Sequence, residues 1–426
     1  MKRHIFGRKG TAGVLAAFAI ASIAAACGSS SSATSTTQGS KTGFTGTVTV
    51  AESTTLSGAI SELGQGGLQG VQDAVANINA NGGLLGKKVV IASADDATSP
   101  ATGAANIRSM ILNDHAVAIF GPVTSAVAAA EEPIAAQYHI PIFFHTSNDV
   151  ALLTSGFTKY AFGFVPDTVM EPRAAAAYLL HEVGSKPITI GTISPDYSFG
   201  HATVSGFLQA LQQLHVNYHL VVQQWPPLAA TNIAPYLAAV TAAHPQYVFN
   251  AQFGGDLVNF TQQANQFGFF KNTKLIAMYS MAPLQALGAN APAGSIGFDR
   301  AAFWAINAPA MKPFIAQFKA KYSAYPSAWA IMAYTAVQSW AYAVEKAKTF
   351  DGTKVADALS GATVPTIQGA VTLRACDHQA NVPEYVGTVA PSTSSKYGLR
   401  LWNSPTFVAP PSQIMLTCAQ SLALRG

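Results

Sequence analysis

The sequence predicts an α/β protein built from two doubly wound lobes. Short strands alternate with amphipathic helices from Thr47 to about Val165, and the same alternation resumes after Asp167. Strand and helix in repeated succession indicate parallel sheets covered on both faces. Of the 426 residues, 49% are hydrophobic and 10% are charged. A chain of about 400 residues exceeds what a single core usually holds, so two lobes are expected.

The first 26 residues are predicted to be an export signal. A basic start precedes an apolar stretch at residues 13–23, which is too short to span a membrane comfortably. Residues 20–27 read Ile-Ala-Ser-Ile-Ala-Ala-Ala-Cys, which resembles the lipobox of bacterial lipoproteins and predicts lipidation of Cys27. Because Ala24 stands where leucine is preferred, cleavage by an ordinary signal peptidase after Ala26 is the alternative.

Residues 27–46 are predicted to be a flexible tether, because Gly, Ser and Thr dominate the segment and leave little to bury. The leader holds four of the 24 Lys and Arg residues and none of the 20 Asp and Glu residues, so the exported chain carries no net charge. No surface for nucleic acid is therefore expected.

In the first run, each predicted strand is short, β-branched or aromatic, and bounded by turn residues. These strands span residues 47–51, 87–92, 117–121 and 140–145. The helix at 67–80 carries apolar side chains at helical spacing and stops at Asn81-Gly82-Gly83. The helix at 100–113 begins with proline after a Ser99 cap.

In the second run, strands are predicted at residues 188–193, 218–223, 247–251 and 275–278, with helices between them. Ligands of doubly wound sheets collect at the carboxyl ends of the strands. The loops that follow the strands span residues 54–63, 121–125, 145–149, 194–200 and 252–256. They are rich in Ser, Thr and Gly, which suits a small zwitterion or neutral polar solute.

Besides Cys27, two cysteines remain, Cys376 and Cys418. In an oxidising exported compartment such a pair predicts a disulfide rather than a metal or redox site, since neither a Cys-x-x-Cys motif nor a nearby histidine pair accompanies it.

Several short motifs together carry a resemblance to a known family. They are Leu-Ser-Gly at 56–58, Ile-Asn-Ala-Asn-Gly-Gly at 78–83, Asp95-Asp96, Ile-Phe-Gly-Pro-Val-Thr-Ser at 119–125, Asp-Tyr-Ser-Phe-Gly at 196–200 and Tyr-Thr-Ala-Val-Gln-Ser at 334–339. From Val48 to about Val389 the chain resembles the solute-binding proteins of ABC importers for branched-chain amino acids. The resemblance implies a type I periplasmic binding protein fold with two Rossmann-like lobes.

The resemblance also implies three crossings between the lobes, which we place near Val165, Ser280 and Gln379. Lobe 1 would contain residues 47–165 and 281–379, and lobe 2 would contain residues 166–280 and 380–426. A disulfide between Cys376 and Cys418 would pin the last segment beside the hinge.

When the binding positions of the family are matched residue by residue to this sequence, the first lobe would bind the carboxylate and ammonium groups of an amino acid. Ser125 and Ser147 match hydroxyls that bind the carboxylate, and the main-chain carbonyl of His145 matches the acceptor of the ammonium. Ser125 precedes the helix at 126–137, whose free amide groups favour an anion. Capping of a helix or turn is the alternative role of both serines. Ser57, Leu63, Thr146 and Phe253 complete the expected set, together with the second-lobe residues below.

In the second lobe, Asp256 matches an acidic partner for the ammonium, and a charge-assisted pair there would select α-amino acids. Its alternative role is to cap the helix at 257–267. Tyr197 and Phe199 match positions that cover the ligand, with packing inside the lobe as the alternative.

The chain also departs from the family pattern. Ala59 stands where proline is frequent, and Leu63 stands where an aromatic residue often covers the ligand. These departures leave several ligand classes open: branched-chain and other amino acids, short amides, urea and aromatic acids.

Binding is predicted rather than catalysis. Gly-x-Ser-x-Gly and His-Glu-x-x-His are absent, and the segment before Lys87-Lys88 does not fit a P-loop. The glycines from Gly64 to Gly70 have the wrong spacing for a dinucleotide site and indicate close packing of a helix start instead. We therefore expect no cofactor and no metal. The first hypothesis is a lipid-tethered protein that delivers a small solute to ABC permease subunits, and the second is a ligand sensor for a signalling partner.

Overall fold

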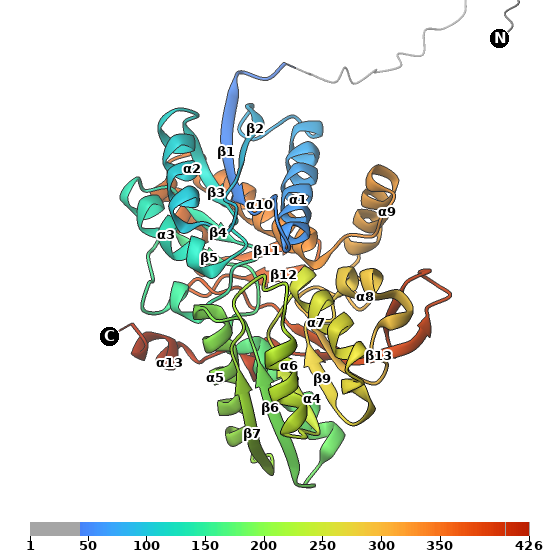
Figure 1. Cartoon of the computed structure of the whole chain (residues 1–426). Coiled ribbons are helices and arrows are strands. Elements are labelled where there is room, and N and C mark those ends of the chain that lie inside the picture. The colour runs from blue at the N-terminus through green and yellow to red at the C-terminus, as the bar shows by residue number, and fades with distance from the viewer. Residues whose placement is uncertain (1–42, 405, 426) are drawn as a thin grey trace, which may run out of the picture. The chain divides into compact units, whose positions relative to one another are not determined.

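The computed structural model describes residues 43–404 and 406–425 and contains two main sheets (Figure 1). The first sheet is parallel, in the order β2-β1-β3-β4-β5. Its strands are β1 (Thr47–Thr54), β2 (Lys88–Asp95), β3 (Ala116–Phe120), β4 (Ile142–Phe144) and β5 (Ala161–Gly163). The predicted leader, Cys27 and most of the predicted tether lie outside the described residues.

The second sheet has the order β14-β13-β10-β9-β8-β6-β7, with β15 beside β13. Its parallel strands are β6 (Ile188–Ile193), β7 (Tyr218–Gln224), β8 (Tyr247–Asn250), β9 (Lys274–Ala277) and β10 (Ile296–Asp299). The antiparallel strands are β13 (Glu384–Thr393), β14 (Arg400–Trp402) and β15 (Phe407–Ala409). The predicted fold class, two α/β lobes with a sheet in each, is confirmed.

Helices cover both faces of the first sheet. Helices α1 (Ser61–Ala80) and α10 (Ala328–Ala347) pack on one face, and α2 (Pro100–Leu112) and α3 (Ser125–Gln137) pack on the other. The strands contribute alternate side chains to the two cores, for example Phe120 to one and Ile119 to the other, as the period of a pleated strand requires. The lobe also contains α9 (Met311–Tyr322), α11 (Gly352–Leu359) and a hairpin of β11 (Thr363–Thr366) with β12 (Gly369–Thr372).

The second sheet is covered in the same way. Helices α4 (Met170–Val183) and α5 (Ser198–Gln213) pack on one face, and α6 (Ala234–Ala242), α7 (Gly254–Gln266) and α8 (Met281–Leu287) pack on the other.

Short helical segments occur elsewhere in the chain. They are η1 (Val150–Leu153), η2 (Phe269–Lys271), η3 (Gly288–Asn290), α12 (Pro411–Ile414) and α13 (Cys418–Ala423).

Glycines let α1 approach its neighbours closely, as the sequence predicts. A Cβ atom at Gly70 would lie 2.2 Å from the carbonyl oxygen of Ala330 on α10, and one at Gly67 would lie 2.5 Å from Cε1 of His145. Real Cβ contacts are essentially never this short, so α1 could not keep this position with larger residues there.

Two of the links between the lobes lie side by side. Gly163 and Gln379 form a parallel bridge, and Nε2 of Gln379 donates to the carbonyl of Val165 at 2.7 Å. The second link differs from the prediction near Ser280, because β10 pairs with β9 inside the second sheet and the chain leaves that sheet only after Asp299. Residues 296–299 therefore belong with the second sheet, since a further strand completes it before the chain crosses.

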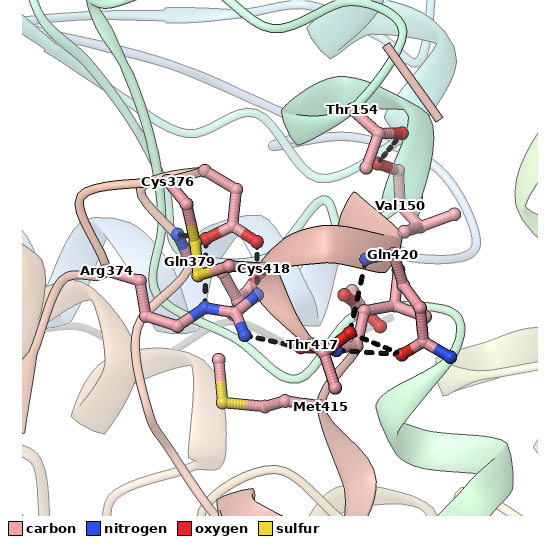
Figure 2. A network of polar contacts seen from close by, with 12 residues as sticks. Val150, Thr154, Arg374, Cys376, Gln379, Met415, Thr417, Cys418 and Gln420 are labelled. Atoms are coloured by element: carbon pink, nitrogen blue, oxygen red, sulfur yellow. Dashed lines mark hydrogen bonds and ion pairs between the residues drawn. A yellow bond between two sulfur atoms is a disulfide. The ribbon is translucent and has the colours of Figure 1, made fainter. Parts of the chain in front are cut away.

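The disulfide between Cys376 and Cys418 is formed, with the two Cα atoms 5.8 Å apart (Figure 2). It joins the segment just before Gln379 to the start of α13. Arg374 supports this junction, because its guanidinium pairs with Asp377 and also donates to the carbonyl of Leu416. The C-terminal segment is thus held beside the third link between the lobes.

Candidate ligand-binding site

A pocket with an empty volume of about 240 Å³ lies where loops of both lobes meet. Its lining residues all follow the carboxyl ends of strands or lie on helices that face them, which is the expected place for a ligand in doubly wound sheets. They are Leu63, Val123, Ser125, Thr146, Asn148 and Trp329 from the first lobe, and Tyr197, Phe199, Phe253, Met278 and Arg300 from the second lobe and the link that follows it.

The structure brings together many of the residues that the sequence singled out. Leu63, Ser125, Thr146, Tyr197, Phe199 and Phe253 line the pocket, whereas Ser57, His145, Ser147 and Asp256 do not. Sequence reasoning missed Val123, Asn148, Met278, Arg300 and Trp329. Val123 and Asn148 fall inside loops that the strand pattern had marked, but no local signal distinguishes Arg300 or Trp329, because both enter the pocket through tertiary packing.

Ser125 is the first residue of α3, and the cap position belongs to Thr124. The Oγ atom of Ser125 accepts hydrogen bonds from the backbone amides of Asn148 at 3.4 Å and Asp149 at 3.2 Å. A hydroxyl has two acceptor sites and one hydrogen, so the Ser125 hydroxyl has its hydrogen left to donate. Beside the unpaired amides of a helix start, this hydrogen suits an anionic group.

The two neighbouring predicted residues lie deeper in the first lobe. His145 is fully buried, and its ring nitrogens contact Oε1 of Glu52 at 3.2 Å and Oγ1 of Thr146 at 2.9 Å. Ser147 is also buried, its amide donates to the carbonyl of Pro122, and its hydroxyl has no partner among the described residues.

Aromatic side chains form the second-lobe wall of the pocket. The rings of Tyr197 and Phe199 are 5.8 Å apart, and Phe199 meets Phe253 edge to face at 5.5 Å. Burial of the hydroxyl end of Tyr197 raises its pKa, so this side chain is neutral at ordinary pH. The wall is therefore uncharged and mainly apolar.

Asp256 lies in the first turn of α7 and is buried. Its Oδ2 accepts a hydrogen bond from the amide of Ala229 at 3.0 Å. Burial raises the pKa of its carboxyl group to about 6. The helix cap itself is Phe253, so Asp256 acts on α7 through its place in the first turn and not as the cap residue.

The lobes also touch beside the pocket. A Cβ atom at Gly255 would lie 2.2 Å from the carbonyl oxygen of Ala59, and one at Gly254 would lie 2.4 Å from Oε1 of Glu62. Two adjacent glycines at the start of α7 thus allow the loop after β1 to come into direct contact with the second lobe.

Arg300 follows β10 and joins the two lobes at the pocket. Its Nε donates to Glu171 of α4, its Nη1 donates to the carbonyl of Thr146, and its guanidinium lies 5.0 Å from the ring centre of Trp329. Only 3% of the residue is exposed. Arg300 thus has partners in both lobes and also lines the pocket, so a ligand that contacts Arg300 would act at the junction of the two lobes.

Buried carboxyl groups surround this arginine. Glu171 also accepts a hydrogen bond from Nδ2 of Asn148 at 3.0 Å. Burial raises the pKa of Asp299 to about 7, and burial with the nearby charge of Glu171 raises the pKa of Glu384 well above its usual value. Burial also raises the pKa of Glu171, although the charge of Arg300 opposes this shift, and Glu171 is the carboxyl group that pairs directly with Arg300.

A model of the periplasmic binding protein family matches residues 47–395, which is most of the chain. The chain belongs to this family. Its class is therefore that of solute-binding proteins and not of enzymes, and its fold is the type I fold of the family. No helix in residues 43–404 or 406–425 is both long and apolar enough to cross a membrane.

Individual relatives agree with the family. The Leu/Ile/Val-binding protein homolog 7 of Brucella abortus is 26% identical over 324 residues, which cover 72% of this chain and 79% of the relative. A periplasmic binding protein from Burkholderia mallei has a TM-score of 0.79 at 22% identity, covering 88% of this chain and 97% of its own. A solute-binding protein of an ABC transporter from Rhodopseudomonas palustris, in complex with 3,4-dihydroxybenzoic acid, has a TM-score of 0.75 at 19% identity, covering 85% and 98%.

Proposed function

We propose that this solute-binding protein is the extracytoplasmic receptor of an ABC importer and binds a small solute that carries a carboxylate, either an amino acid of the branched-chain type or a related acid. The observation that carries the proposal is the pocket, in which hydroxyl and amide groups of the first lobe face an aromatic wall of the second.

The ligand would be bound by closure of the lobes. The Ser125 hydroxyl and the start of α3 would receive the carboxylate, with Ser147 and the His145 carbonyl nearby, and the aromatic wall would cover the apolar part. Since each lobe supplies only half of the contacts, ligand binding favours the closed arrangement over the open one. The closed arrangement would then present the surface that the permease subunits recognise.

Two ligand classes are supported by the comparisons. One relative is named as a Leu/Ile/Val-binding protein homolog, and one structural neighbour holds 3,4-dihydroxybenzoic acid. Both classes combine a carboxylate with an apolar body, which is the chemistry that this pocket offers.

Thermal unfolding of residues 43–426 against a panel of amino acids and aromatic acids tests the proposal. A ligand at 100 times its dissociation constant should stabilise the protein by about 2.7 kcal/mol. Ser125→Ala should lose most of this stabilisation, whereas the exposed Ser392→Ala should keep it. If no member of the panel raises the unfolding temperature, the proposed function is wrong.

We further propose that lipid on Cys27 anchors the protein to the outer side of the membrane. Metabolic labelling with radioactive palmitate should label the full chain and not a Cys27→Ala variant. Equal labelling of the two proteins, or none of either, would exclude the anchor.

A further inference from the structure

The charges that line the pocket are unusual for an amino-acid site. Among the described lining residues, Arg300 is the one permanently charged side chain, and none is Asp or Glu. An α-amino acid brings an ammonium group whose burial needs an acceptor, preferably a carboxylate. The pocket instead offers hydroxyl groups and the guanidinium of Arg300, which pairs with Glu171 through Nε and has further N–H groups that can donate to a carboxylate.

Arg300, which lines the pocket, retains hydrogen-bonding capacity. A guanidinium group carries five N–H donors, of which Nε is used by Glu171 and one on Nη1 by the carbonyl of Thr146. Nη2 has no hydrogen-bond partner among the described residues. An acceptor delivered by a ligand would occupy one of the donors that Arg300 does not use within the protein.

Three carboxylates near the pocket already accept hydrogen bonds from the protein, whereas Oδ1 of Asp299 and both oxygens of Glu384, which do not line the pocket, have no partner among the described residues. Oδ1 of Asp149 accepts from the amide of Ala151 at 3.0 Å, and Oδ2 of Asp256 accepts from Ala229. Glu171 accepts from Arg300 and from Asn148. The carbonyl of Thr146 accepts from Arg300; it is the neighbour of the His145 carbonyl, which the family resemblance assigns to an ammonium group.

We infer that the ligand is a small monocarboxylic acid without an α-ammonium group, and that Arg300 is the specificity-determining residue that holds its carboxylate together with Ser125. This inference rests on the proposed function and narrows it. Arginine and a hydroxyl donor can hold both oxygens of one carboxylate. The apolar lining then surrounds a branched or aromatic body; it consists of Leu63, Val123, Phe199, Phe253, Met278 and Trp329.

Isothermal titration of the wild-type protein with matched ligands tests the inference. The probes are leucine, 4-methylpentanoate, which is leucine without its ammonium group, leucinamide, which lacks the carboxylate, and 4-hydroxybenzoate. We expect 4-methylpentanoate or 4-hydroxybenzoate to bind at least tenfold more tightly than leucine, and leucinamide not to bind. If leucine or another amino acid binds more tightly than both acids, the inference is wrong and the proposed function stands. If neither these probes nor any amino acid or aromatic acid binds, both are wrong.

A charge-conserving variant tests the role of Arg300 itself. Arg300→Lys keeps a cation beside Glu171 but loses the planar pair of donors, so the affinity for the acid should fall at least tenfold. The exposed Arg108→Lys on α2 is the matched control and should bind as the wild type does. An unchanged affinity in Arg300→Lys would exclude the assigned role, and the ligand comparison on wild-type protein does not depend on the folding of any variant.

Discussion

Removal of the disulfide should destabilise the protein by an amount that follows from its position in the chain. The cysteines are 42 residues apart. In the chain-entropy description, opening a loop of this length costs about 4 kcal/mol at 25 °C, because the unfolded chain regains the freedom that the cross-link removed. Proteins unfold with a total free energy of about 5–15 kcal/mol, so the loss is a large part of the whole.

Thermal unfolding of a Cys376→Ser/Cys418→Ser variant measures this loss. With an unfolding entropy of about 2.1 cal/mol/K per residue, a loss of about 4 kcal/mol lowers the unfolding temperature of a domain this long by roughly 5 °C. The hydrogen bonds from Arg374 to Leu416 and from Arg425 to the Cys376 carbonyl persist in the variant, so the C-terminal segment should stay docked.

Reduced wild-type protein is the matched control and should unfold at the temperature of the double variant, while reductant should leave the variant unchanged. If the variant unfolds within about 1 °C of the oxidised wild type, the loop-entropy reasoning does not apply to this protein.

Three further outcomes are expected. In urea unfolding, Gly70→Ala should lower the free energy of unfolding by about 1–3 kcal/mol, because the added Cβ would overlap the Ala330 carbonyl. The exposed Gln72→Ala on the same helix is the control and should have little effect. Equal stability of the two variants would contradict the packing argument. Burial raises the pKa of Glu132 from 4.5 to about 8 in the folded protein. Between these pH values the carboxyl group is ionised in the unfolded chain and protonated in the folded one. The free energy of unfolding should therefore fall as the pH rises from 4.5 to about 8, by up to about 1.4 kcal/mol per pH unit. Glu132→Gln should therefore stabilise the protein at pH 8 and not at pH 4, and a gain that is independent of pH would refute the assignment. Gly255→Val should weaken ligand affinity at least tenfold and change the free energy of unfolding little, because the valine side chain would meet the Ala59 carbonyl where the lobes touch. An unchanged affinity in calorimetry would show that this contact is not part of lobe closure.

The pattern of the chain was sufficient for the architecture. Alternating strands and helices predicted two parallel sheets covered on both faces; the first sheet is parallel, whereas the second adds the antiparallel strands β13, β14 and β15, which the pattern did not predict. The close glycines from Gly64 to Gly70 and the pairing of Cys376 with Cys418 were also readable, because spacing and compartment restrict what these residues can do. These are local properties, or properties that follow from composition.

Tertiary structure decided the chemistry of the pocket and the path of the chain between the lobes. β10 is only a short strand, and its place beside β9 depends on pairing that local sequence does not encode, which is why the second link lies after Asp299 and not near Ser280. The same placement brings Arg300 to the pocket beside Trp329, from a part of the chain without a motif. Sequence by itself determined the strands and helices of the two regular runs up to residue 278, because periodicity and turn residues are local. Only the folded chain determined the strands that complete the second sheet and which side chains meet, because those contacts join residues far apart in sequence.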